Sequence, residues 1–391
     1  MIGLVLLLLS ACLALLAVHP FITYPLSLKL LARHSARTVI RSAVHEHAAL
    51  MPPKVALCVC AYNEESVIRQ KAENMLAMRE AVPGLQLLIY VDCASDRTAS
   101  ILSEFSSQIE VIVSPTRLGK THGMNLLVTK TDAELLVFSD ANVTFADDAI
   151  PHLLRPFDDP AVGCVCGHLI YVTKLASATA ATGSLYWRLE ETIKELESRT
   201  GSVMGADGSI FAIRRELHRP PPVDIIDDMF ISLSILCDGY RIMRAADAVA
   251  YEETTSHQAD EFARKVRISC QAYNVHRLLS PRLQQLPALN RYKYVSHKLL
   301  RWFSIYSLGA AILVFYAALY AFHAWWIMLA NTVTLIAIAI GGLALPSSLL
   351  GKVADVFSAL LATGLGIVRS VRGDRFQVWT PPASARLITP E

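Results

Sequence analysis

The chain has 391 residues, of which 53% are hydrophobic and 18% are charged, and its mean hydropathy is +0.39. This composition is too apolar for an ordinary soluble protein and too polar for a chain that lies wholly in a membrane, so it predicts a mixture of the two. The formal net charge is only +2 and the basic residues are scattered. No nucleic-acid partner is therefore expected.

The first predicted element is an N-terminal transmembrane helix (residues 1–24). Residues 2–23 carry no charged side chain, and the run is long enough to cross a hydrocarbon core of about 30 Å. Four basic residues follow: Lys29, Arg33, Arg37 and Arg41. The positive-inside rule then predicts that residues 25–50 form a basic cytoplasmic linker. A cleaved signal peptide, the alternative, has its basic residues before the apolar run rather than after it.

Residues 51–295 alternate short apolar runs with helical stretches. The first four apolar runs read VALCVCAY, LQLLIYVD, IEVIVS and ELLVFSDA. This alternation predicts an α/β domain with a mostly parallel sheet, which binds its ligands beyond the carboxyl ends of the strands. Glu64, Asp92 and Asp140 stand at such ends. No glycine-rich GxGxxG or GxxxxGKT string follows a strand, so the dinucleotide-binding and P-loop classes lack their phosphate cradle.

Two further transmembrane helices are predicted within residues 299–345, with Trp302 and Tyr306 as interface anchors. Residues 350–372 are less apolar, because Asp355 interrupts them, and arginines follow them directly. They predict an interfacial or re-entrant helix followed by a cytoplasmic tail, residues 373–391. Together these elements predict a multi-pass protein of the inner (plasma) membrane with its α/β domain on the cytoplasmic side.

The motifs of the chain resemble those of glycosyltransferase family 2. They read CAYNEE, VDCASDRT, RLGKTHGMN, FSDANV, GADGSIFAIRREL, IDDMFISLSILCDGYRI and EFARKVRI, in that order. The resemblance extends to SHKLLRW and to Trp379 and Arg386 in the tail. It is closest to the membrane-integrated branch with hyaluronan, chitin and cellulose synthases and bacterial exopolysaccharide enzymes. It implies a GT-A-like nucleotide-sugar-binding domain beside the transmembrane helices.

The resemblance implies a donor site at the strand ends. Ala61, Tyr62 and Asp92 would hold the base, with Asp92 accepting from a uracil N–H, and Glu64 would lie beside them. The alternative interpretation of Asp92 is a helix cap, which is the more common role of a lone Asp at a strand end. Lys120 would place a point charge near the diphosphate. The alternative is a surface lysine with no such role. The side chain of Asn125 would bond the nucleotide or only fix its loop.

A divalent cation, Mg²⁺ or Mn²⁺, is the cofactor that the resemblance implies. Asp140 and Asn142 occupy the positions of the family's Asp-x-Asp motif, whose oxygens bind the metal that bridges the diphosphate. Asn142 offers a carbonyl oxygen without a charge, so metal binding is expected to be weaker than with two aspartates. The alternative is that Asn142, which follows a strand, only forms a turn.

The resemblance places the catalytic base at Asp228, the second carboxylate of the Asp227–Asp228 pair. A base must take the acceptor hydroxyl proton during inversion, whereas an acidic pair before an apolar helix also caps it. Asp227, Arg264 and Asp207 are expected on the acceptor side, and Arg267 near the diphosphate. Processive synthases have Gln-x-x-Arg-Trp at this place. This chain has Arg264 in place of the Gln, keeps the arginine as Arg267, and has Ile268 in place of the Trp.

These features predict an inverting glycosyltransferase that moves a sugar from a nucleotide diphosphate, with UDP-sugars as the first donors considered, to a lipid-linked or glycan acceptor. Membrane lipids and export or polysaccharide-assembly proteins are the expected further partners. A processive polysaccharide synthase and a catalytically silent nucleotide-sugar-binding scaffold are the alternatives. The missing Trp argues against a processive synthase. A silent scaffold would not need all five of the donor-site and catalytic residues, Asp92, Lys120, Asp140, Asp228 and Arg267.

Overall fold

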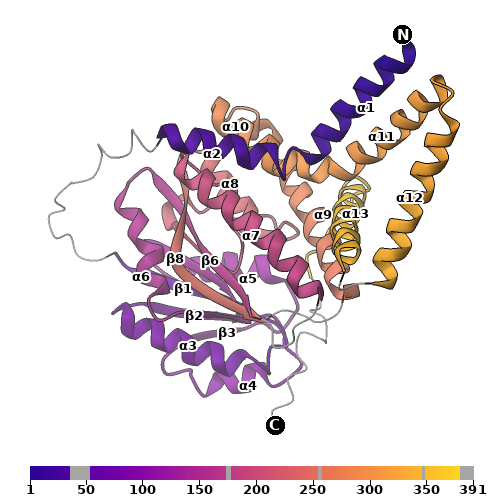
Figure 1. The fold of residues 1–391 in the computed structure, drawn as a ribbon. Coiled ribbons are helices and arrows are strands. Elements are labelled where there is room, and N and C mark those ends of the chain that lie inside the picture. The colour runs from indigo at the N-terminus through magenta and orange to yellow at the C-terminus, as the bar shows by residue number, and fades with distance from the viewer. Residues whose placement is uncertain (36–52, 173–177, 254–257, 346–347, 379–391) are drawn as a thin grey trace.

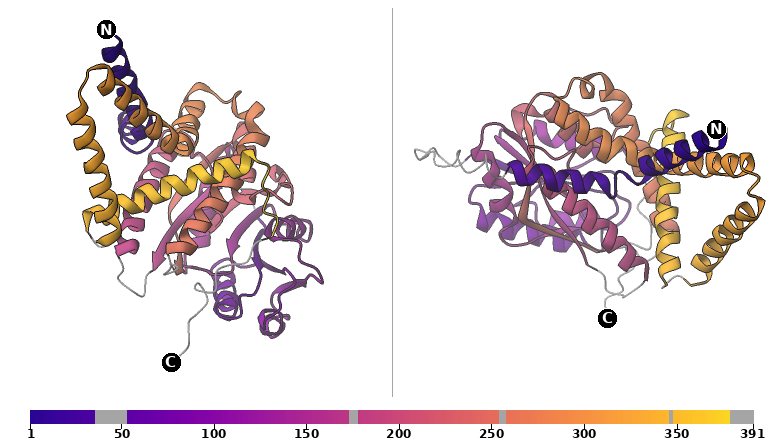
Figure 2. Two further views of the ribbon diagram at one scale, coloured as in Figure 1. Left: turned by 90° about the vertical axis from the view of Figure 1, so that its right-hand side faces the viewer. Right: turned by 45° about the horizontal axis from the view of Figure 1, so that its top comes forward.

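The computed structural model describes residues 1–35, 53–172, 178–253, 258–345 and 348–378 (Figure 1). Most of the basic linker and most of the predicted tail, including Trp379 and Arg386, lie outside these residues. Within them, a mixed sheet and its covering helices form one body, and the apolar helices project from one side of it (Figure 2).

The sheet has eight strands in the order β3-β2-β1-β4-β7-β6-β8-β5. The strands are β1 (Val55–Ala61), β2 (Gln86–Val91), β3 (Glu110–Val113), β4 (Leu135–Asp140), β5 (Val143–Phe145), β6 (Val162–Val172), β7 (Ile210–Arg214) and β8 (Arg241–Glu253). The first four are the apolar runs predicted from the sequence, and β1 to β4 pair in parallel. Pairs β4–β7, β6–β7 and β5–β8 are antiparallel, whereas β6–β8 is parallel.

Helices cover both faces of the sheet because its central strands are apolar on both faces. The helices of this domain are α3 (Ile68–Ala81), α4 (Thr98–Ser103), α5 (Lys120–Thr129), α6 (Ala149–Leu154), α7 (Ala178–Arg199), α8 (Asp227–Cys237), α9 (Gln258–Leu283) and α10 (Ala288–Tyr294). One core contains Cys58 and Phe138 of the sheet with residues of α5, α8 and α9. The other contains Leu57 and Val137 with residues of α3 and α6.

The N-terminal apolar run forms two helices rather than one. Helix α1 (Ile2–Val18) and helix α2 (Thr23–Ser35) meet at a bend of 62°. Pro20 lies in the break, where it has no N–H to donate and its ring blocks continuation of the helix. The N-terminal helix predicted over residues 1–24 is therefore broken in the structure between Val18 and Thr23, and the bent pair together has the length and composition of a membrane span.

Three other helical stretches of the described chain are long and apolar enough to cross a membrane: Ala288–Ala321, Trp325–Gly342 and Leu349–Val371. The first comprises α10, the π-helical turn Val295–Leu299 and α11 (Leu300–Ala321), and the other two correspond to α12 (Trp325–Ala344) and α13 (Leu349–Val371). Helix α1 lies beside α11, where the hydroxyl of Ser10 donates to the carbonyl of Ala311 (2.8 Å). Helix α13 instead runs across the direction of α11 and packs on α9 (Figure 2).

A buried charged cluster joins these apolar helices to the α/β domain. His297, in the π-helical turn Val295–Leu299, lies 3.0 Å from Glu190 and 2.8 Å from Glu197, both on α7. Arg301 pairs with Glu190, and the hydroxyl of Tyr24 on α2 donates to Glu197 (2.5 Å). The SHKLLRW segment thus fixes α7 against α2 and the start of α11.

Candidate active site

The predicted polar residues gather at one edge of the sheet. Ala61 ends β1 and is buried, Asp92 directly follows β2, and Asp140 is the last residue of β4. Because these strands are parallel neighbours, with Cys60 opposite Asp140, their carboxyl ends meet at this edge.

The carboxylate of Asp92 holds the loop that leads into α5. It accepts the backbone N–H groups of Leu118 (2.7 Å) and Gly119 (3.0 Å) and the hydroxyl of Tyr90 (3.2 Å). An ionised carboxylate offers about four acceptor positions, so about one is left for a ligand. The contact between Asp92 and a uracil base stays a prediction.

A stacked pair lies beside Asp92. The guanidinium carbon of Arg117 lies 3.5 Å from the ring centroid of Tyr62, and Arg117 Nε is 3.9 Å from an Asp92 oxygen. Glu64 occupies the turn after β1, where its backbone N–H donates to the hydroxyl of Thr98 (2.7 Å). Arg117 was not among the predicted site residues, although it opens the RLGK segment.

Lys120 stands among three carboxylates. Its Nζ is 2.7 Å from Asp140 Oδ1 and 3.8 Å from Asp227 Oδ2. A Cβ added to Gly208 would lie 3.2 Å from the same Nζ and 3.0 Å from Asp228 Oδ2, so Asp228 is the third neighbour. Burial acts to lower the pKa of Lys120, but these carboxylates raise it above its ordinary value. The ammonium group is therefore charged and could meet a diphosphate.

The acidic pair begins α8. Asp227 is buried, and its Oδ2 has no hydrogen-bond partner in the part of the chain described. Asp228 Oδ1 accepts the N–H of Met229 (2.5 Å). Burial, and then the charge of Asp227, raise the pKa of Asp228 to about 7, against the opposing effect of Lys120. A carboxylate with such a pKa suits a general base at neutral pH.

Glu252, which was not among the predicted site residues, lies beside the metal motif. The side-chain amide of Asn142 donates to Glu252 Oε1 (3.1 Å), because β5 pairs with β8 in the register that places Val143 opposite Glu252. Burial raises the pKa of Glu252 to about 7; Arg264 opposes this rise and Asp140 adds to it.

Two residues of α3, Lys71 and Asn74, hold β4 and β5, the strands on either side of the metal motif. The ammonium of Lys71 donates to the hydroxyl of Ser139 (2.9 Å) and the carbonyl of Val143 (2.7 Å). Asn74 makes two 2.9 Å bonds with the backbone of Phe145. Burial lowers the pKa of Lys71 to about 7, while Asp140 acts to raise it. Neither residue was predicted to belong to the site.

The two predicted arginines of α9, Arg264 and Arg267, approach the site. Burial and then Arg264 lower the pKa of Arg267 to about 10, while Asp140 and Asp228 act to raise it, so Arg267 lies in the field of both carboxylates. Its Nη1 also donates to Gln271 (3.2 Å). The charge of Arg264 interacts with Tyr171 and Glu252, and its Nη1 lies 3.5 Å from Glu261.

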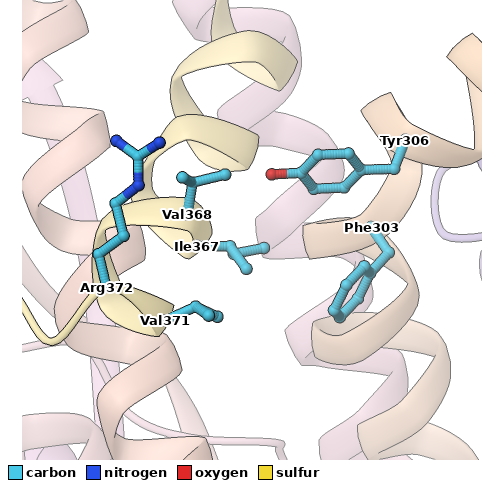
Figure 3. Close-up of a pocket in the computed structure, with 6 residues that line it drawn as sticks. All are labelled: Phe303, Tyr306, Ile367, Val368, Val371 and Arg372. Carbon is cyan, nitrogen blue, oxygen red and sulfur yellow. The ribbon is translucent and has the colours of Figure 1, made fainter.

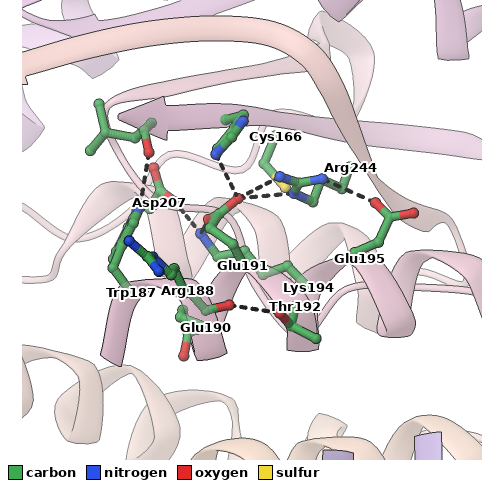
Figure 4. A network of polar contacts seen from close by, with 12 residues as sticks. Cys166, Trp187, Arg188, Glu190, Glu191, Thr192, Lys194, Glu195, Asp207 and Arg244 are labelled. Atoms are coloured by element: carbon green, nitrogen blue, oxygen red, sulfur yellow. Dashed lines mark hydrogen bonds and ion pairs between the residues drawn. The ribbon is translucent and has the colours of Figure 1, made fainter. Parts of the chain in front are cut away.

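Two predicted residues have protein partners of their own. Asp207 accepts from the buried ammonium of Lys194 (2.6 Å), which also contacts Glu191 in a network with Arg244 (Figure 4). Asn125 donates to the carbonyl of Pro221 (2.9 Å). Of the two interpretations of Asn125, this contact matches the one in which it fixes a loop.

Comparison with known proteins identifies the family. The family model for glycosyltransferase like family 2 matches residues 52–271, more than half of the chain. Relatives named N-acetylglucosaminyltransferase, from Rhizobium sp. (strain N33) and Rhizobium leguminosarum bv. viciae, are 23% and 22% identical over 61% and 66% of this chain. The aligned part spans 56% and 64% of their lengths.

The fold is also that of a solved enzyme. The mannosyltransferase PcManGT from Pyrobaculum calidifontis, in complex with GDP-Man and Mn²⁺, matches with a TM-score of 0.67 and 20% identity. The match covers 94% of this chain and 99% of that one. The fold of the chain is GT-A-like, with apolar helices attached. The chain therefore belongs to glycosyltransferase family 2.

Proposed function

We propose that this enzyme inverts the configuration of the sugar and transfers one residue at a time to a membrane-associated acceptor. The observation that carries the proposal is the position of Lys120 among Asp140, Asp227 and Asp228. This cluster joins a cation for the leaving diphosphate to a carboxylate suited to act as the base, which are the two needs of an inverting transfer.

In this proposal the donor lies along the strand ends. Ala61, Tyr62 and Asp92 border the base, with UDP as the first nucleotide to test, and Glu64 lies in the adjoining turn. Lys120 and Arg267 face the diphosphate. The acceptor oxygen attacks the anomeric carbon opposite the diphosphate and gives its proton to Asp228. The bond from the anomeric carbon to the diphosphate oxygen breaks, and the cations stabilise the negative charge that this oxygen gains.

A divalent cation fits Asp140 and Asn142, because both offer oxygen donors, with Glu252 next to them. Among the described residues, no group of three or more His, Cys, Asp or Glu side chains is arranged to hold a metal. We therefore expect Mg²⁺ or Mn²⁺ to bind chiefly when the donor diphosphate supplies further ligands. Such a cation would supply charge neutralisation at the leaving group.

The acceptor side lies toward α7 and α9. Asp227 and Asp207 border it in this proposal, together with Arg264, which lies next to Glu252. Ile268 has no ring to stack on a sugar chain, which supports single transfer. The apolar helices support an acceptor delivered from the membrane, with the catalytic domain on the cytoplasmic side.

The experiment is a donor panel. Purified full-length enzyme in lipid nanodiscs is incubated with UDP- and GDP-sugars, Mn²⁺ and an extract of membrane lipids, and nucleotide release and product length are measured. We expect release with one donor class and products extended by a single sugar. Long polymers would instead support a processive synthase, and no release with any donor would contradict the proposal.

A further inference from the structure

A groove of about 440 Å³ opens between α11 and α13 (Figure 3). It is lined by Phe303, Tyr306, Ile367, Val368, Val371 and Arg372. The hydroxyl of Tyr306 is already used, since it donates to the carbonyl of Gly364 (2.7 Å). Apart from Arg372, the lining side chains therefore offer a ligand only apolar surface. The volume is in the range of small-molecule sites.

Hydrocarbon can reach this groove from a membrane. Both of its walls belong to helices with the length and apolar composition of membrane spans. The part of α11 that lines it, around Phe303, is the part nearest the catalytic domain, because Tyr273 of α9 packs edge to face against Phe303 (centroids 6.0 Å apart). The groove therefore lies where the apolar helices meet the catalytic domain.

Arg372 differs from the arginines on either side of it. Arg369 is paired with Asp374 (2.6 Å), and Arg375 with Asp224 (3.4 Å). Arg372 has no carboxylate partner in any described segment of the chain. A guanidinium at the edge of an apolar groove is complementary to an anionic group, above all a phosphate, that carries a hydrocarbon chain.

The chain after Arg372 leads to the active site. The carbonyl of Asp374 accepts from Asn274 (3.1 Å), and that of Phe376 accepts from Gln271 (3.0 Å). Gln271 in turn accepts from Arg267, the arginine near Asp140 and Asp228. Four residues span at most about 14 Å, which bounds the distance from Arg372 to Phe376.

We propose that this groove binds the hydrocarbon chain of a lipid-linked acceptor, with the lipid phosphate against Arg372. The polar end of the lipid then extends past α9 toward Asp228. This inference rests on the proposed function, because it names the acceptor of the same active site. It distinguishes a lipid phosphate acceptor from a free glycan, which needs neither the apolar walls nor the isolated arginine.

The test uses the full-length enzyme in phosphatidylcholine nanodiscs that contain a diazirine-labelled polyprenyl phosphate. A matched set contains diazirine-labelled phosphatidylglycerol. Crosslinked residues are identified by mass spectrometry. We expect the polyprenyl phosphate to label α11 and α13 at the groove. Arg372→Gln should reduce this labelling about tenfold, as for loss of one charge-assisted contact, whereas Arg372→Lys should retain part of it. Val368→Trp should also reduce it, because the larger side chain fills the groove.

Leu329→Trp is the matched control, because Leu329 is 56% exposed on α12 and does not line the groove. It should leave the labelling unchanged. Equal labelling by phosphatidylglycerol would mean that bulk lipid fills the groove and would overturn the inference, as would crosslinks between two protein copies across it. Labelling that survives Arg372→Gln would also overturn it. Because crosslinking needs no turnover, failure of the donor panel and failure of the groove remain distinguishable.

Discussion

The backbone carbonyl of Gln377 lies so close to Gly119 that a Cβ added to Gly119 would be 2.2 Å from its oxygen. The side chain of Gln377 also donates to the carbonyl of Leu118 (3.1 Å). The segment after α13 therefore covers the loop that Asp92 holds and that leads directly to Lys120. Gly119 permits this approach, because it lacks a side chain and has a φ of +92°.

Gly119→Ala should separate the tail from this loop and weaken donor binding. The methyl group would overlap the Gln377 carbonyl, and the left-handed backbone adds strain of about 1–2 kcal/mol. Gly84→Ala is the control: its φ is +84° and nothing lies within 4 Å of the added Cβ. We expect both variants to unfold at lower temperature, and only Gly119→Ala to raise the KM for the donor. Equal donor KM values would show that the tail contact does not affect the donor site.

Asp228→Asn should abolish most transfer while leaving donor binding intact. The amide keeps the shape of the side chain but cannot take a proton, so kcat should fall by about 10² to 10⁴. Asp140→Ala should instead weaken metal-dependent donor binding. Calorimetric titration with nucleotide and Mn²⁺, together with single-turnover rates, separates the two effects. Wild-type turnover in Asp228→Asn would move the base to another residue, with Asp227 the first to test.

The transfer rate should rise with pH through about 7. The raised pKa of Asp228 means that the carboxyl is protonated, and therefore inactive as a base, below this value. The rate should fall about tenfold per pH unit on the acid side and level off above it. Asp228→Asn should lack this acid limb. A rate that stays flat across neutrality in the wild type would show that Asp228 does not limit transfer by its protonation.

The strands β1 to β4 were predictable because their apolar runs are local, and the polar residues at their ends follow from parallel pairing. The break between α1 and α2 also has a local signal, Pro20, which the long uncharged run obscured. The cluster of Lys120 with Asp140, Asp227 and Asp228 was expected only through the family resemblance. Composition and periodicity alone do not bring α5 and α8 together.

Other site residues depend on pairings that no local pattern reveals. Lys71 belongs to a charged helical segment and would be placed in solvent, but β4 and β5 bury it. Glu252 reaches Asn142 only through the antiparallel register of β5 with β8, which joins positions 110 residues apart. The lining of the groove likewise depends on how α13 crosses α11, which apolar composition does not determine.

Lys71→Met should destabilise β4 and β5, the strands on either side of the metal motif. The change leaves the Val143 carbonyl and the Ser139 hydroxyl without their donor, at a cost of about 1–3 kcal/mol for a buried unsatisfied group. Because Val143 follows Asn142 directly, the concentration of Mn²⁺ needed for half-maximal rate should also rise. Lys54→Met, at an exposed pair with Asp132, is the control and should change neither the unfolding midpoint nor the Mn²⁺ dependence appreciably. Lost stability with unchanged Mn²⁺ dependence would limit Lys71 to a structural role.

Asn142→Asp should make the stability of the protein depend on Mn²⁺. The amide of Asn142 now donates to Glu252 at 3.1 Å, so a carboxylate in its place would face another carboxylate. Without metal, one of the two must take up a proton, since like charges this close raise a pKa. A pKa raised by about one to two corresponds to a destabilisation of about 1.4–2.7 kcal/mol. A cation that binds both oxygens would reverse this penalty.

The thermal unfolding midpoint of Asn142→Asp should therefore lie below that of the wild type in chelator and rise more than that of the wild type when Mn²⁺ and UDP are added. The double variant Asn142→Asp with Glu252→Gln is the matched control, because it removes the facing carboxylate. It should unfold close to the wild type in chelator. If Asn142→Asp loses stability and Mn²⁺ with UDP does not restore it, position 142 shapes the turn between β4 and β5 and does not bind the metal.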